Sequence, residues 1–65
     1  MEISEKIHRL REAKKLSQTE LANLIFRKQP LISAYESGKS KPPKATAYRL
    51  AEVLEVPCEY LLDDA

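Results

Sequence analysis

The sequence predicts an all-α fold, a compact five-helix domain that spans residues 1–65. Three observations carry this prediction: apolar residues recur at helical spacing through most of the chain, β-branched residues form no runs with period two, and glycine occurs once. A chain of 65 residues has room for one small domain and no second one.

The first two helices follow from apolar spacing and a capping signature. Residues 3–14 place apolar side chains at spacings of four, three and three, in Ile3, Ile7, Leu10 and Ala13. Ser17 and Glu20 fit a capping box, in which each side chain accepts a hydrogen bond from the other residue's backbone N–H. We therefore expect a second helix from Ser17, with an apolar face made of Leu21, Ala22, Leu24 and Ile25.

A third helix follows after a tight connection, over residues 29–37. Pro30 suits a first helical turn, because its φ is fixed near the helical value and it has no N–H to satisfy, which makes Gln29 the cap or a first-turn residue. Gly38 ends this helix, because glycine readily takes the left-handed conformation. Ile32 and Tyr35 face inward. Two short helices joined in this way indicate a helix-turn-helix.

The outer face of the third helix has the chemistry of a surface that reads DNA. It presents Gln29, Ser33 and Ala34, with Lys28 just ahead, and a major groove about 12 Å wide admits such a face. A glutamine can contact adenine N6 and N7, a lysine can donate to guanine, a serine can donate to a base or a phosphate, and an alanine methyl can touch thymine. For each of the four residues the alternative is ordinary exposed helix surface.

The charge of the chain is unevenly placed. The net charge is only +1, yet residues 27–49 hold six basic residues against Glu36 alone, a local charge of +5. Three of these residues, Lys39, Lys41 and Lys44, belong to a segment with two adjacent prolines that resists helix formation. We expect a basic loop that contacts phosphates, with solvated surface charge as the alternative. We expect Glu36 to pair with a basic side chain or a helix end.

The remaining helices close the domain. Residues 45–55 form a fourth helix, and Pro57 opens a short fifth helix in which Leu61 and Leu62 close the core. The tyrosines stand at helical spacing beside apolar neighbours, so we expect them in the core or at its rim: Tyr35, Tyr48 and Tyr60. Phe26 either fills space in the core or is exposed and serves a partner.

No enzymatic activity, metal or cofactor is expected. His8 and Cys58 are single, and neither has a second residue at metal-ligand spacing or in the order of a catalytic triad. No glycine-rich loop is present to hold a nucleotide phosphate. The lone cysteine, with neither a signal peptide nor an apolar stretch of about 18 residues, indicates a cytoplasmic protein without membrane contact.

A set of spaced positions runs along almost the whole chain: Ile7, Leu10-Arg11, Leu16-Ser17-Gln18, Glu20-Leu21-Ala22, Ile32-Ser33, Glu36, Gly38-Lys39, Pro43, Leu50-Ala51, Leu54, Val56 and Tyr60-Leu61-Leu62. This set resembles the phage repressor and Cro class of helix-turn-helix proteins, the XRE family, over about residues 3–62. The resemblance implies a lambda repressor-like domain that places its third helix in the DNA major groove. It also implies a homodimer on a palindromic operator in double-stranded DNA.

The resemblance further implies roles for particular residues. Gln18 matches a family glutamine that holds a backbone phosphate and braces the recognition helix. The positions that usually meet base edges are matched by Lys28, Gln29, Ser33 and Ala34. The loop that grips the opposite stretch of phosphates is matched by Ser37, Lys39, Lys41 and Lys44.

The chain departs from the family pattern at three places. Phe26-Arg27-Lys28 stands where the family usually has Gly-Val-Ser, which replaces a left-handed turn residue, a core valine and a cap. Pro30 and Leu31 stand where serine or threonine is frequent, which removes a hydroxyl and an N–H that can contact phosphate. Glu55 stands where glycine is common.

The predicted function is sequence-specific DNA binding as a transcriptional regulator, a repressor. We expect a dimer with its recognition helices about 34 Å apart, joined through the region of the fourth and fifth helices, including Leu61 or Leu62. One alternative is a DNA-binding antitoxin or restriction-modification control protein. The other is a protein-interaction module that keeps the fold without DNA binding, which an exposed Phe26 in an apolar patch, without a continuous basic face, would favour.

Overall fold

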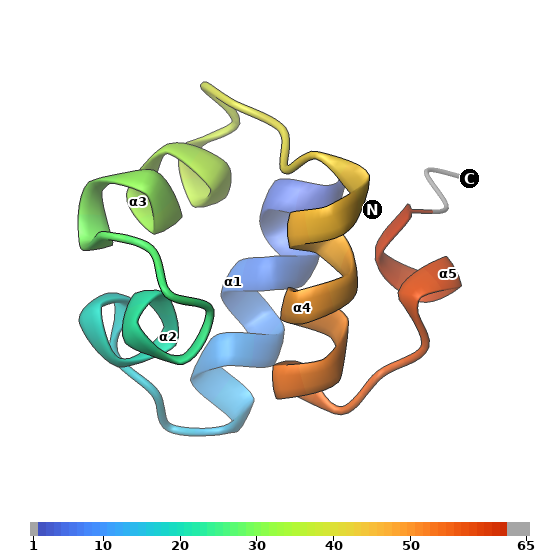
Figure 1. Ribbon diagram of the computed structural model, residues 1–65, viewed down its shortest axis with the longest axis horizontal. Coiled ribbons are helices and arrows are strands. Elements are labelled where there is room, and N and C mark those ends of the chain that lie inside the picture. Colours follow the sequence, from blue (N-terminus) through green and yellow to red (C-terminus); the bar gives the residue numbers. More distant parts are fainter. Residues whose placement is uncertain (1, 63–65) are drawn as a thin grey trace.

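The computed structural model describes residues 2–62, so Met1 and residues 63–65 of the expected domain lie outside the described residues. Its elements are α1 (Ile3–Ala13), α2 (Gln18–Leu24), α3 (Gln29–Ser37), α4 (Lys44–Leu54) and α5 (Cys58–Leu62). Figure 1 shows α1 between the α2–α3 pair on one side and α4 with α5 on the other, and α1 packs against α3, α4 and α5. No strand occurs within residues 2–62. The prediction of an all-α, five-helix fold is confirmed.

The core draws on all five helices or their ends. Six large side chains are fully buried in it: Ile7, Leu21, Ile25, Ile32, Leu50 and Leu61. Each such aliphatic side chain stabilises the fold by about 1.5–3 kcal/mol on burial. Ile32 and Tyr35 face inward, as predicted, so α3 packs through these two residues and leaves its opposite face outside.

The two adjacent leucines of α5, which the sequence pattern does not distinguish, differ in exposure. Leu61 has no exposed surface, whereas Leu62 is 38% exposed. The prediction that both close the core is therefore wrong for Leu62. Leu61 is already covered within the chain, which removes it as a candidate for an interface with a second copy.

The start of α2 is fixed by the predicted capping box. The backbone N–H of Glu20 donates to Ser17 Oγ at 3.0 Å, and the backbone N–H of Ser17 donates to Glu20 Oε1 at 2.8 Å. Two N–H groups that the first turn of a helix leaves without partners are thereby satisfied. Gln18, the first residue of α2, is held in place by this cap.

Four helices end at a residue in the left-handed conformation, and only one of the four is glycine. The residues are Lys15, Phe26, Gly38 and Glu55, with φ between 59° and 82°. Each end carries hydrogen bonds of the Schellman type; after α2, for example, Arg27 N–H donates to the carbonyl of Ala22 at 2.8 Å and Phe26 N–H to that of Asn23 at 3.1 Å. These bonds keep the left-handed turn at Phe26 and at Glu55 although glycine is absent from both positions.

Substitution of Lys15 measures the free-energy cost of the left-handed conformation directly. A left-handed φ costs a residue with a Cβ about 1 kcal/mol more than glycine. We expect Lys15→Gly to raise the free energy of unfolding by about 1 kcal/mol, which corresponds to about 4–8 °C in a domain of this size. Ala13→Gly, two residues earlier at an exposed helical position, serves as the matched control and should destabilise by about 0.5–1 kcal/mol. Equal effects of the two variants in thermal denaturation would contradict this explanation.

Candidate nucleic-acid interface

The outer face of α3 begins at the first turn of the helix. Lys28 takes the N-cap position without a side-chain cap bond, Gln29 is the first helical residue, and Pro30 follows in the same turn. The sequence allowed Gln29 to be either the N-cap or a first-turn residue of this helix, and in the structure it is a first-turn residue. The amide of Gln29 therefore stands at the start of α3.

A bond between two amides joins α2 to α3. Gln29 Nε2 donates to Gln18 Oε1 at 2.7 Å, and Gln18 Nε2 donates to Glu36 Oε1 at 3.1 Å. Gln18 thus contacts the first turn and the last turn of α3 at once, which is the bracing that the resemblance implied. A glutamine amide carries two N–H donors and a carbonyl that accepts twice. Both amides therefore keep hydrogen-bonding capacity beyond these contacts.

Glu36 is the centre of the bracing network. Its Oε2 accepts from Arg11 Nε at 2.6 Å, and its Oε1 lies 3.2 Å from Arg11 Nη2 and 2.9 Å from His8 Nδ1. The side chains of Glu36 and Arg11 are only 6% and 11% exposed. Arg11 also donates through Nη1 to the carbonyl of Leu16 at 2.6 Å. The expectation that Glu36 is a structural partner is confirmed.

The network sets the ionisation of both partners. Burial alone raises the pKa of Glu36, but the hydrogen bonds from Arg11, His8 and Gln18 favour the carboxylate more strongly, so its pKa lies below the ordinary value. The hydrogen bond to Glu36 in turn raises the pKa of Arg11. The pair is therefore charged at neutral pH and ties α1 to the last turn of α3.

Two of the predicted base-contact residues, Gln29 and Ser33, share a face of α3 with Ser37. Gln29 and Ser33 are one turn apart, as are Ser33 and Ser37, and residues at this spacing lie on one face of a helix. Lys28 is exposed, while Gln29, Ser33 and Ala34 are half-buried. The hydroxyl of Ser37 donates to the carbonyl of Ala34 at 3.2 Å, so its proton is already engaged.

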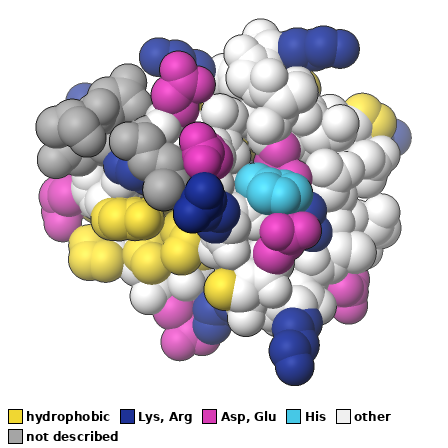
Figure 2. All heavy atoms as spheres, turned by 180° about the vertical axis from the view of Figure 1, so that it is seen from behind, with side chains coloured by type: hydrophobic (Ala, Val, Ile, Leu, Met, Phe, Trp, Pro, Cys, Tyr) yellow, Lys and Arg dark blue, Asp and Glu magenta, His cyan; other side chains and the backbone are white. Residues whose placement is uncertain are grey.

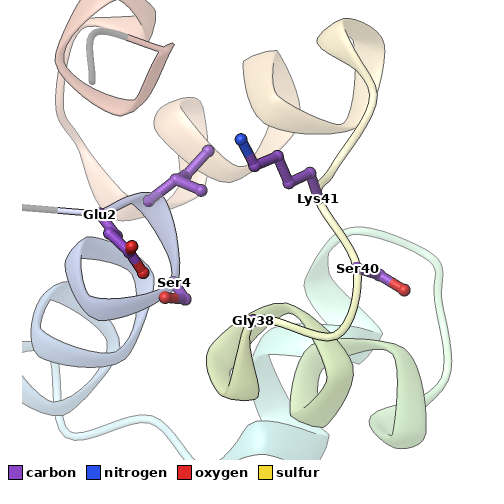
Figure 3. A pocket seen from close by; sticks show the side chains of 6 residues that line it. Glu2, Ser4, Gly38, Ser40 and Lys41 are labelled. Carbon is purple, nitrogen blue, oxygen red and sulfur yellow. The ribbon is translucent and has the colours of Figure 1, made fainter.

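The three lysines that follow α3 are exposed but differ in setting. Lys44 opens α4, and is thus a helix residue where the sequence predicted loop, whereas Lys39 and Lys41 lie in the connection. Figure 3 shows Lys41 pointing across a pocket toward the start of α1, where Glu2 and Ser4 lie, and Ser40 pointing away from it.

Several large apolar side chains of the described residues are exposed. One of them is Leu24, which is 50% exposed, so the prediction that it shares the apolar inner face of α2 is wrong. Phe26 is 76% exposed, with the guanidinium carbon of Arg49 5.5 Å from its ring centroid, so it does not fill the space of a core valine. Tyr48 and Tyr60 are about half exposed, whereas Tyr35 is buried.

Lys6 joins α1 to α5, because its Nζ donates a hydrogen bond to the backbone carbonyl of Tyr60 at 2.7 Å.

The described residues offer no site for a metal ion or a reactive thiol. No three His, Cys, Asp or Glu side chains between residues 2 and 62 come together as ligands. The hydrogen bond from Cys58 to Glu59 raises the pKa of the thiol, which disfavours the reactive thiolate. None of the helices in this part of the chain is long and apolar enough to cross a membrane.

His8 and Arg11 were missed as parts of the site by the sequence analysis. They lie one turn apart on α1, which is a visible signal, but their partner Glu36 is 28 and 25 residues away in the chain. Spacing within one helix does not report contacts over such separations.

Comparison with known proteins agrees with this geometry. A helix-turn-helix family model matches residues 7–61. The chain is 34% identical over 59 residues to an uncharacterized HTH-type transcriptional regulator, YqaE of Bacillus subtilis (strain 168), and the match covers 91% of this chain and 51% of that protein. The chain thus spans about half the length of this curated relative.

Two solved structures share the fold. The P22 c2 repressor, solved in complex with a synthetic operator, superposes with a TM-score of 0.93 over 100% of this chain and 98% of that one, at 23% identity. The SinR protein, solved in complex with the SinI protein, gives a TM-score of 0.84 at 27% identity over 95% of this chain and 61% of that one. Since the family model covers residues 7–61, most of the chain, this chain belongs to the helix-turn-helix family.

Proposed function

We propose that this domain binds double-stranded DNA in a sequence-specific manner as a transcriptional regulator, with α3 in the major groove. The observation that carries the proposal is the braced amide of Gln29 at the start of α3. The P22 c2 repressor, which has the same fold, is solved on an operator. The family match and the transcriptional-regulator relative support the same function.

The amide of Gln29 is well suited to read adenine. One of its N–H groups is used on Gln18, which leaves the carbonyl oxygen and the second N–H as an acceptor and donor side by side. Adenine presents the complementary pair, N6–H₂ and N7, in the major groove. Lys28, Ser33 and Ala34 are proposed as the remaining base contacts because they border the same face.

Phosphate contacts are proposed on both sides of this face. Gln18 keeps a second N–H after bonding Glu36, and this group is suited to a phosphate oxygen. On the other side we propose Ser37, Lys39, Lys41 and Lys44. Ser37 would have to turn its hydroxyl away from Ala34 to donate.

We propose that the active form is a homodimer acting as a repressor in the cytoplasm. A single α3 reads few base pairs, and a two-fold dimer on a palindrome doubles that number with a spacing of about one helical turn. The exposed side chains of α4 and α5 supply a suitable interface: Tyr48, Tyr60 and Leu62. Figure 2 shows hydrophobic side chains gathered on the α5 side of the back face.

Selection from a pool of random duplexes tests the function. The domain is incubated with the pool, bound duplexes are amplified and sequenced, and the cycle is repeated. The proposal predicts enrichment of one sequence with two-fold symmetry. A pool that stays unenriched while the protein remains folded would overturn it.

Salt dependence tests the phosphate contacts separately. Each lysine that neutralises a phosphate adds about 0.9 to the slope of log affinity against log salt. We expect Lys39→Ala to reduce the slope by about this amount and to weaken binding to all duplexes alike. Lys14→Ala, which removes a lysine whose side chain pairs with Glu55 at the end of α4, is the control and should leave the slope unchanged. An unchanged slope for Lys39→Ala would remove Lys39 from the interface.

The exposure of Phe26 favours a protein partner as a second candidate. Phe26 exposes a large aromatic side chain to solvent and has a left-handed backbone conformation. This combination is unusual for a residue that has no role in an interaction. SinR, which shares the fold, is solved with another protein. A DNA-binding antitoxin or a restriction-modification control protein shares the fold and differs in its partner and regulon, and a toxin or endonuclease gene beside this one would identify it. Failure of the selection, with Phe26→Ala abolishing binding to the product of a neighbouring gene, would favour the interaction module.

A further inference from the structure

We propose that the carboxylate of Glu36 fixes the direction of the hydrogen bonds that lead from Gln29 through Gln18, and thereby determines which atoms of the Gln29 amide face the base. Glu36 is then a positioning residue that sets specificity without touching DNA. This proposal rests on the proposed function, because the order of the amide atoms matters only where Gln29 reads a base.

Two hydrogen bonds run in one direction from the first turn of α3 to its last turn. Gln29 Nε2 donates to Gln18 Oε1 at 2.7 Å, and Gln18 Nε2 donates to Glu36 Oε1 at 3.1 Å. Figure 1 shows α3 beside α2, and α3 packs against both α2 and α1. Each amide therefore gives its NH₂ to the next residue and receives through its carbonyl from the one before.

The two glutamines alone do not determine this direction. The carbonyl oxygen and the NH₂ of an amide stand on the same carbon and are similar in size, so a half-turn of the group exchanges them without changing the packing. Gln18 can bond Gln29 equally well by donating to it. A group outside the two amides must therefore select the direction.

Glu36 makes this selection because an ionised carboxylate only accepts hydrogen bonds. Arg11 holds it in place, with Nε 2.6 Å from Oε2 and Nη2 3.2 Å from Oε1. The side chain of Glu36 is only 6% exposed, and its pKa lies below the ordinary value, so it is charged at neutral pH. A Gln18 carbonyl turned toward Oε1 would set two acceptors against each other where water has little access. Gln18 must therefore turn its NH₂ to Glu36 and its carbonyl to Gln29.

The direction fixes the order of the two groups that Gln29 offers to a base. Its NH₂ lies on the side of Gln18, so its carbonyl oxygen lies on the opposite side, and the free N–H and the oxygen face outward together. Adenine offers N6–H₂ and N7 to such a pair. With the opposite direction these groups exchange places, which would set donor against donor at N6 and acceptor against acceptor at N7. Because the order is set before DNA binds, no binding free energy is used to turn the amide.

Glu36→Gln is expected to reverse the direction. The Oε2 position accepts from Arg11 Nε at 2.6 Å, the shorter of the two contacts with Arg11, so the carbonyl of the introduced amide takes that place. Its NH₂ then takes the Oε1 position, which faces Gln18 and His8 Nδ1. Both of these neighbours can accept, Gln18 by turning its carbonyl round. The NH₂ of Gln18 is then directed at Gln29, which must accept.

NMR measures this direction on the labelled 65-residue chain without DNA. A scalar coupling crosses a hydrogen bond from the donor nitrogen to the acceptor carbonyl carbon, so it identifies which amide donates. We expect a coupling from Gln29 Nε2 to Gln18 Cδ in wild type, and from Gln18 Nε2 to Gln29 Cδ in Glu36→Gln. Denaturation curves show that each protein is folded.

Two results of this measurement would overturn the proposal. One is a wild-type coupling in which Gln18 donates to Gln29, and this result needs no variant. The other is a coupling from Gln29 to Gln18 that persists in Glu36→Gln, since the carboxylate would then not select the direction.

Binding measurements show whether the direction sets specificity. Two duplexes are compared by competition: the duplex enriched by selection, and one that differs only at the base pair whose preference Gln29→Ala abolishes. Wild type should discriminate between them by about 5–150-fold. We expect discrimination close to onefold for Glu36→Gln at this pair, with its preferences at the other pairs kept.

A core variant separates this effect from a loss of stability. Ile7 is fully buried, and Ile7→Val destabilises the domain modestly without changing a polar group, so it should keep the discrimination of wild type. Unchanged discrimination in Glu36→Gln, or a loss of the same factor at every base pair, would show that Glu36 only supports the fold. Failure of the proposed function is seen separately, because no duplex is then enriched while the couplings still report the direction.

Discussion

Replacing Gln29 by alanine is expected to abolish base preference at one pair of each half-site while preserving affinity for other sequences. A bidentate contact between glutamine and adenine contributes about 1–3 kcal/mol of discrimination, which corresponds to about 5–150-fold in affinity. The variant should therefore bind the selected duplex and its variant at that pair equally. The measurement is a set of competition assays with every single base-pair substitution of the selected duplex.

Gln18→Ala distinguishes reading from bracing. The side-chain amide of Gln18, the first residue of α2, accepts a hydrogen bond from Gln29. Its loss should weaken binding to all duplexes, because the proposed phosphate contact is removed. It should also reduce the discrimination at the base pair that Gln29 reads. If Gln29→Ala instead weakened all duplexes by the same factor, Gln29 would be a phosphate contact or a structural residue and the assignment would be wrong.

Replacing Glu36 by alanine is expected to cost about 3–5 kcal/mol of folding free energy, because it leaves the mostly buried charge of Arg11 without its carboxylate partner. A domain of this size has a total stability of the same order, at about 0.05–0.15 kcal/mol per residue. Chemical denaturation of Glu36→Ala should therefore show a protein that is partly unfolded without denaturant. Only a small loss of stability would show that water reaches Arg11 and replaces its partner.

Two further variants identify the cause of that loss. Replacing both partners, as in Arg11→Met with Glu36→Leu, removes the unpaired charge and should recover most of the stability. Glu55→Ala breaks an ion pair with Lys14 in which the Glu55 side chain is exposed, and should change stability little. A double variant as unstable as Glu36→Ala would assign the effect to packing.

The same carboxylate predicts how stability depends on pH. The pKa of Glu36 is lower in the folded protein than the ordinary value, so its contribution is complete above that ordinary value and is lost as the pH falls through the folded pKa. The denaturation midpoint should therefore fall on acidification below about pH 4.5, and by less in Glu36→Gln, whose amide does not titrate. Glu55, whose pKa the Lys14 contact also lowers, titrates in both proteins. Equal acid sensitivity of the two proteins would contradict this role of Glu36.

Local patterns in the sequence were sufficient for the fold. Helical spacing placed most of the buried faces, with Leu24 on α2 as an exception. Ser17 and Glu20 marked the start of α2, and Pro30 with Gly38 bounded α3. Each of these signals acts over a few residues, so it can be interpreted without knowledge of the rest of the chain. The prediction for Leu62 was wrong because two adjacent leucines on a five-residue helix show no periodicity that would distinguish a buried position from an exposed one.

The features that the sequence could not supply depend on distant contacts. The left-handed turn at Phe26 is held by bonds to the carbonyls of α2, which compensate for a residue that disfavours that conformation. The contact between His8 and Glu36 joins α1 to α3, and only the packing of those helices brings the two side chains together. The outer face of α3 was predicted from spacing, but the network that holds Gln29 on that face was not.

The central claim, that α3 binds in the major groove of DNA, is tested most directly by an NMR titration of the labelled domain with duplex DNA. The account predicts that the largest backbone amide shifts fall on residues 28–37, on the start of α2 and on residues 39–44. Shifts confined to α5 and to the surface around Phe26, or no shifts at low salt, would contradict it.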